Sequence, residues 1–167
     1  LFGYFSELIA RKQREPSDDL ATVIANAEVD GEPIDMVDAI NYFIISATAG
    51  HDTTSATTAG GIKLFSQNPE QLDLLNEHPE HLSTAFQEVT RLTAPVRHFV
   101  RTSVQDQQVG GKDIKEGDSL ALWYPSASRD EDKFENPNQF DITRSPNPHM
   151  SFGYGRHGCL GRHLAAL

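Results

Sequence analysis

The only cysteine of the chain, Cys159, lies in a glycine-rich stretch that could bind a metal. This stretch, Phe152–Gly161, reads Phe-Gly-Tyr-Gly-Arg-His-Gly-Cys-Leu-Gly, and its four glycines predict a tight loop whose backbone amides can point at the sulfur. Such amides would lower the pKa of the thiol, and Phe152 with Leu160 could keep water off it. A thiolate held in this way is a soft metal ligand. The alternative is a buried, inert cysteine in a glycine-rich turn.

A zinc site is a second alternative for the same region. It would be built from His149, His157, Cys159 and His163. Structural zinc sites favour paired short spacings such as Cys-x-x-Cys, and a chain with one cysteine has no such pair. The spacing therefore favours a single thiolate ligand over a zinc cluster.

A polar interruption in a long predicted helix is the next candidate for chemistry. No proline occurs from Met36 to Gln67, and apolar residues recur there at helical intervals, so we expect a central helix over about 36–67. In its middle, Gly50 weakens the helix beside the carboxylate of Asp52 and the hydroxyl of Thr53. Such features can bend a helix or open a gap in its hydrogen-bond ladder. The alternative is a solvated polar patch on a surface helix.

Glu88 and Arg91 are three residues apart in a helix predicted over about 79–92, so both lie on one face. An exposed pair at this spacing contributes only about 0.2–0.5 kcal/mol to helix stability. A buried pair differs, because removing one partner strands the other charge at a cost of several kcal/mol. The spacing alone leaves both possibilities open.

After Pro95 the apolar pattern changes to period two, which predicts a small sheet of short strands over about 96–124. Arg101 falls in the first of these strands, where a surface arginine on an edge strand is one interpretation. A polar, proline-punctuated meander over about 128–148 then leads to the loop at 152–161. The expected fold class is mainly α with a minor β-sheet.

The composition is that of a soluble globular protein of about one domain, with 167 residues, of which 38% are hydrophobic and 23% charged. The net charge of −10 argues against nucleic acid as a partner, and no apolar run reaches the length of a membrane span. One cysteine excludes an internal disulfide framework and suits a reducing cytoplasm. The chain lacks an initiator methionine and stops in what reads as the start of a helix, so we expect one partial domain, truncated at both termini.

Three of these motifs together resemble those of the cytochrome P-450 family. The spacing within 152–161 matches the family's haem-ligand loop, Phe-x-x-Gly-x-(Arg/His)-x-Cys-x-Gly. Residues 49–54 match its helix motif, (Ala/Gly)-Gly-x-(Asp/Glu)-Thr-(Thr/Ser), and 88–91 match its Glu-x-x-Arg pair. Through 47–54, 93–96 and 124–127 the chain looks most like bacterial class I members that hydroxylate monoterpenes of the α-terpineol type.

The resemblance implies chemical roles for the matched residues. Cys159 would be the axial thiolate of haem iron, and His157 and Arg101 would bind the haem propionates. Asp52 and Thr53 would form the acid and alcohol pair that delivers protons.

Structural roles follow from the same resemblance. Glu88 and Arg91 would be the buried pair that pins the haem-loop region. Further haem contacts would come from Phe152, Gly153, Leu160, Gly161 and Ala49, and the substrate pocket would be lined by Ala49 and Val96. One position departs from the family pattern, because Gln139 stands where many members have an arginine or histidine that completes a triad with the pair. Arg144 is the candidate replacement.

The resemblance also implies the C-terminal haem-binding half of the cytochrome P-450 fold and a haem-thiolate monooxygenase. Its cofactor would be haem b (iron protoporphyrin IX), and its substrates would be O2 and a small apolar molecule such as a terpenoid. Electrons would come from NAD(P)H through a ferredoxin reductase and a ferredoxin that docks near Arg156 and Arg162. The alternatives are a peroxygenase-like haem-thiolate protein that does not hydroxylate, and a non-catalytic fragment that does not hold haem.

Overall fold

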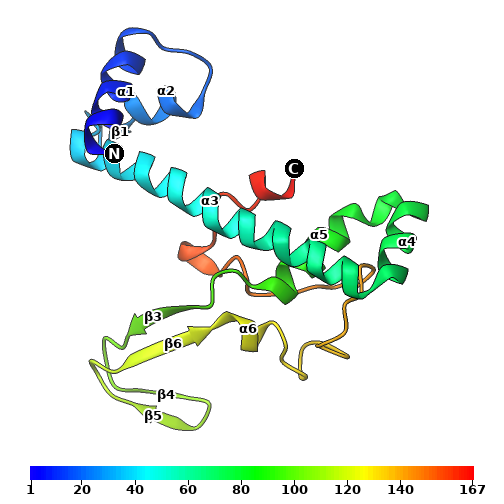
Figure 1. Ribbon diagram of the computed structural model, residues 1–167. Helices are drawn as coiled ribbons and strands as arrows, with labels where there is room; N and C mark the ends of the chain where they lie inside the picture. Colours follow the sequence, from blue (N-terminus) through cyan, green and yellow to red (C-terminus); the bar gives the residue numbers. More distant parts are fainter. The chain divides into compact units, whose positions relative to one another are not determined.

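The longest element of the chain is α3 (Met36–Gln67), a helix of 32 residues (Figure 1). The computed structural model describes all 167 residues, which form two compact units, Leu1–Asp52 and Thr53–Leu167. α3 continues as an α-helix through Gly50. One glycine costs a helix only about 1 kcal/mol, and backbone hydrogen bonds need no side chain at that position. The Thr48 hydroxyl donates to the Ile44 carbonyl at 2.9 Å, one turn earlier.

The first unit packs two helices against the start of α3. It contains α1 (Phe2–Arg14), α2 (Leu20–Ala25) and a short hairpin of β1 (Glu28–Val29) and β2 (Glu32–Pro33). Its core consists of buried apolar side chains, namely Phe5, Ile9, Ile24, Ala25, Ala39, Ile40 and Phe43. The rings of Phe5 and Phe43 stack with 5.3 Å between their centres. Lys12 of α1 pairs with Asp19, whose carboxylate also caps α2.

The second unit is built on α4 (Pro69–Glu77) and α5 (Leu82–Thr93), which the short 3₁₀ turn η1 (Pro79–His81) connects. Proline begins α4, as is usual for the first turn of a helix. The core here consists of Ala85, Val89, Leu92, Phe140 and Ile142. The last part of α3 lies close to α5, because an added Cβ at Gly60 would overlap the side chain of Thr93.

The strands of the second unit form two small antiparallel pairs (Figure 1). β3 (His98–Thr102) pairs with β6 (Ser119–Trp123), and β4 (Gln107–Val109) pairs with β5 (Lys112–Ile114). Gly110 and Gly111 form the turn between β4 and β5 with φ of 56° and 75°, a region that favours glycine.

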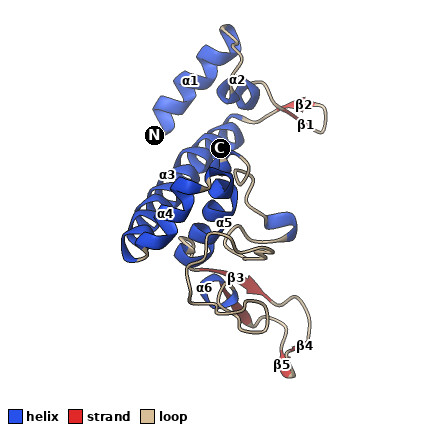
Figure 2. Cartoon of the chain, turned by 90° about the vertical axis from the view of Figure 1, so that its right-hand side faces the viewer, coloured by secondary structure: helices blue, strands red, loops and turns tan.

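After α6 (Tyr124–Ala127) the chain is irregular through residue 150, as the loop drawn in Figure 2 shows. Two 3₁₀ turns follow, η2 (Gly155–His157) and η3 (Leu164–Ala166). The expected fold class, mainly α with a minor sheet, is confirmed. No helix of the chain has both the length and the apolar character that a membrane crossing requires.

Candidate functional site

Glu88 and Arg91 form a buried ion pair on one face of α5. Both side chains are 0% exposed. Arg91 donates to the carboxylate twice, from Nε to Oε2 at 2.8 Å and from Nη2 to Oε1 at 2.7 Å. This two-bond geometry is the strong form of a charge-assisted hydrogen bond. The pair is therefore the buried one, and the exposed alternative is excluded.

The other donors of Arg91 hold the irregular segment that follows α6. Nη1 donates to the carbonyl of Ser128 at 2.8 Å and to that of Pro137 at 2.6 Å, and Nη2 also donates to the carbonyl of Gln139 at 3.2 Å. The guanidinium lies 5.0 Å from the ring centre of Phe134, within the range of a cation–π contact. One side chain of α5 thus fixes four positions of a segment with no regular backbone structure.

Glu88 accepts three further hydrogen bonds from residues 141–147, which lead to the Cys159 loop and are called its approach. Arg144 donates from Nε to Oε1 at 3.2 Å, and Asn147 donates from Nδ2 to Oε2 at 2.9 Å. The amide of Asp141 also donates to Oε1, at 3.2 Å. Arg144 therefore supplies the third charge of the cluster, as predicted, while Gln139 contributes its backbone carbonyl.

The loop around Cys159 closes through its own backbone. The Cys159 amide donates to the Phe152 carbonyl at 2.7 Å. Gly153 and Gly155 have φ of 70° and 68°, and an added Cβ at Gly153 would lie 3.3 Å from the His157 carbonyl oxygen. The positive φ and the tight space both favour glycine at Gly153.

The Cys159 thiol is exposed, so the inert buried cysteine is excluded. Leu160 is 93% exposed, so the expected shielding of the sulfur by this side chain is not seen. Leu160 follows Cys159 on a glycine-flanked turn, and its side chain packs against no part of the core. For this reason it does not cover the sulfur as expected.

The single thiol of Cys159 suits a metal whose other ligands come from a cofactor and not from the protein. No group of three or more His, Cys, Asp or Glu side chains in the chain is arranged to hold a metal ion, so the zinc alternative is wrong. His149, one of its proposed ligands, uses both ring nitrogens in other contacts. A single accessible thiol can serve iron that a porphyrin already holds. The residues of the loop therefore fit haem.

His149 is a half-buried, neutral histidine. Burial lowers the pKa of its ring from 6.5 to about 4, and the positive charge of Arg91 acts in the same direction. The negative charge of Glu88 opposes both effects. At neutral pH the ring is therefore a hydrogen-bonding group without charge.

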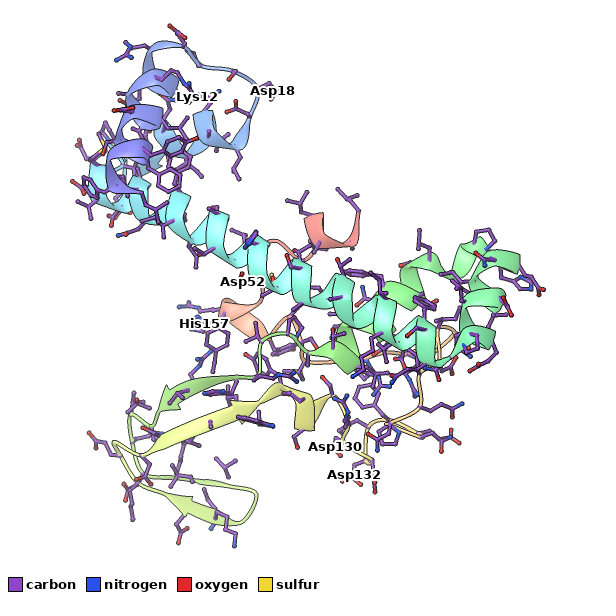
Figure 3. The ribbon with its side chains drawn as sticks, in the orientation of Figure 1. Lys12, Asp18, Asp52, Asp130, Asp132 and His157 are labelled. Atoms are coloured by element: carbon purple, nitrogen blue, oxygen red, sulfur yellow. The ribbon has the colours of Figure 1, made fainter.

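The remaining predicted site residues belong to different elements. In the second unit Thr53 and Val96 are half-buried, and half-buried Arg101 lies on β3 opposite Leu120. His157 is exposed in η2 (Figure 3). In the first unit, Ala49 and Asp52 are exposed on α3.

Three contacts near the loop involve residues to which the sequence assigned no role. Gln87 accepts a hydrogen bond from His149, Ser151 donates to the Thr90 carbonyl at 2.9 Å, and Asn147 binds Glu88. The available signals were the position of Gln87 next to Glu88, and the Asn-Pro-His sequence just before the loop. Neither signal specifies a partner.

Comparison with known proteins identifies the family. Residues 80–167, more than half of the chain, match the family described as Cytochrome P450. The chain belongs to the cytochrome P450 family. Its relatives include bacterial, terpene-related P450s, as the resemblance predicted.

Cytochrome P450-terp from a Pseudomonas species is 46% identical over 166 residues, which are 99% of this chain and 39% of that protein. Linalool 8-monooxygenase from Pseudomonas putida is 39% identical, over 99% of this chain and 41% of its own length. The crystal structure of the P450 CYP108D1 from Novosphingobium aromaticivorans has a TM-score of 0.93 and 45% identity, over 99% of this chain and 40% of that chain. The chain thus spans about two fifths of the length of these P450 relatives.

Replacing Glu88 with glutamine should lower the free energy of unfolding by about 3–5 kcal/mol, because Arg91 and Arg144 lose a shared buried counter-charge. Denaturant titration measures the change. Asp106→Asn is the control, because it disrupts a pair with Lys115 whose side chains are 63% and 69% exposed, and it should change stability little. Equally small effects of the two substitutions would contradict the role of the buried pair.

His149 should make stability depend on pH below neutrality. The unfolded chain binds the proton with a pKa near 6.5 and the folded chain with a pKa of about 4, so the contribution is complete above pH 6.5 and is lost as pH falls toward 4. Between pH 7 and 4.5 we expect a loss of about 2 kcal/mol in the free energy of unfolding that His149→Asn does not show. Identical pH dependence of the two proteins would show that the ring is not held neutral.

Proposed function

We propose that the complete protein is a haem-thiolate monooxygenase in which Cys159 is the protein ligand of haem b. The observation that carries this proposal is one exposed thiol in a glycine-rich loop, beside a helix whose buried charge pair fixes the approach to that loop. The bound haem would activate O2 for insertion into a C–H bond. The overall reaction consumes the substrate R–H, O2, NAD(P)H and a proton, and it yields R–OH, water and NAD(P)⁺.

The chain's own residues would bind the cofactor and supply protons. Arg101 and His157 carry donors suited to the two propionates, and Phe152, Gly153, Leu160, Gly161 and Ala49 would contact the macrocycle. Releasing one oxygen atom as water requires two protons. Thr53 can hold an ordered water through its hydroxyl, and Asp52, the preceding residue of α3, can connect that water to solvent.

The substrate we propose is a small apolar molecule such as a terpenoid. Support comes from the names of two relatives, Cytochrome P450-terp and Linalool 8-monooxygenase. Ala49 and Val96 would line the pocket near the iron. Both side chains are short and apolar, and such side chains discriminate by shape rather than by hydrogen bonding.

The electron donor we propose is an acidic ferredoxin, reduced by NAD(P)H through a ferredoxin reductase. Arg156 within the Cys159 loop and Arg162 directly after it are both exposed, in a chain whose net charge is −10. An acidic partner would be drawn to such a basic spot. A cytoplasmic location agrees with the single cysteine of the chain.

Replacing Thr53 with alanine should uncouple electron use from product formation, because the alcohol that holds the proton-donating water is lost. In the complete protein, supplied with ferredoxin and its reductase, the fraction of NAD(P)H that yields R–OH should fall by at least about tenfold. Thr53→Ser keeps the hydroxyl and should retain most of the coupling. Incorporation of ¹⁸O from labelled O2 into the product, measured beside NAD(P)H and peroxide, gives this fraction.

The same assay separates the alternatives. Product from peroxide alone, with none from NAD(P)H and O2, would identify a peroxygenase-like protein. A protein that binds no haem would refute the proposal outright. Rates that do not fall with added salt would remove the ferredoxin contact at Arg156 and Arg162, since that contact is electrostatic.

A further inference from the structure

We propose that Gln87 and His149 are positioning residues that fix the entry to the Cys159 loop and thereby hold the thiolate in place. This inference rests on the proposed haem-thiolate function. Nε2 of His149 lies 2.8 Å from Oε1 of Gln87 on α5, across 62 positions of sequence. Both residues are half-buried.

The contacts define which ring nitrogen of His149 carries the proton. The side-chain oxygen of Gln87 can only accept, so Nε2 must donate to it. Nδ1 accepts a hydrogen bond from the Ser151 amide at 3.3 Å, so it carries a lone pair. The ring is therefore neutral with its proton on Nε2. The charged groups that act on it, Arg91 and Glu88, belong to the same helix as Gln87.

The ring of His149 touches the loop that carries the cysteine. Its centre lies 5.7 Å from that of Phe152, and the ring of Phe152 lies 6.3 Å from that of Phe86 on α5. The Phe152 carbonyl accepts the Cys159 amide at 2.7 Å. A displacement of His149 would therefore move the residue to which Cys159 is hydrogen-bonded.

A second hydrogen bond also joins α5 to the residues just before the loop. The Ser151 hydroxyl donates to the Thr90 carbonyl, so α5 binds this part of the chain at both His149 and Ser151. The Ser151 contact fixes only the backbone beside Phe152. The His149 contact fixes a ring that packs on Phe152 itself, and for this reason Gln87 is the residue to test.

The chain offers a matched control in Gln71 of α4. Its side-chain oxygen accepts the Ile142 amide at 2.9 Å, so it also joins a helix to the segment before the loop. Ile142 belongs to the apolar core with Ala85 and Phe140, and it makes no ring contact with the loop. Loss of the Gln71 contact should therefore cost stability and leave the thiolate in place.

The test uses the haem-loaded protein at its natural length, with Gln87→Met and Gln71→Met compared with the unsubstituted protein. Each reduced protein is exposed to carbon monoxide, and the Soret bands of the thiolate-ligated and thiol-ligated forms are measured. For Gln87→Met the ratio of the thiolate to the thiol form should fall by roughly five- to tenfold, the value of one hydrogen bond. For Gln71→Met the ratio should be unchanged, although both variants unfold at lower denaturant.

A ratio that Gln87→Met leaves unchanged, or that Gln71→Met lowers equally, would overturn the inference. If Gln87→Met retains no haem, Gln87→Glu decides, because it keeps an acceptor for Nε2 of His149 and should restore the thiolate band. Failure of Gln87→Glu to restore it would also overturn the inference. Absence of the thiolate band from the unsubstituted protein would instead refute the proposed function.

Discussion

A buried guanidinium needs a buried carboxylate, and the second unit of this P450 chain is arranged around that requirement. Taking either charge of Glu88 and Arg91 out of water costs several kcal/mol, which only good geometry and further hydrogen bonds can offset. The structure supplies both, since Glu88 accepts from Arg144, Asn147 and the amide of Asp141, and Arg91 donates to three backbone carbonyls. Each of these bonds joins α5 to the irregular segment between α6 and the Cys159 loop.

That arrangement explains how a loop with little core of its own can present a thiol. Four glycines make the loop around Cys159 compact, and its Tyr154 and Leu160 side chains remain exposed, so much of its order must come from contacts outside the loop. α5 provides that order on adjacent faces. Its charged face holds the approach at Arg144 and Asn147, and its neutral contacts reach His149 and Ser151 just before the loop begins.

Local patterns predicted the elements well, and partners across the fold much less well. Proline-free apolar periodicity predicted α3 over about 36–67, and the period-two pattern after Pro95 predicted short strands over about 96–124, because both depend on neighbours in sequence. The spacing of Glu88 and Arg91 placed them on one helical face but could not say that the face is buried. The role of Arg144 was predicted only because Gln139 stands where many family members have a positively charged residue.

Contacts between distant parts of the chain were missed. Gln87 and His149 are 62 positions apart, and no local pattern pairs them. The exposure of Leu160 was missed for the same reason, since burial depends on the whole fold.

The central claim of this account is that Cys159 is the one protein ligand of an iron that arrives with its other ligands. X-ray absorption at the iron edge of the haem-loaded protein tests it most directly, because the scattering distinguishes sulfur from nitrogen and oxygen. We expect one sulfur scatterer in the unsubstituted protein and none in Cys159→Ser, which replaces the sulfur with oxygen at nearly the same position. A sulfur scatterer that persists in Cys159→Ser, or an iron with only nitrogen and oxygen neighbours in the unsubstituted protein, would contradict the account.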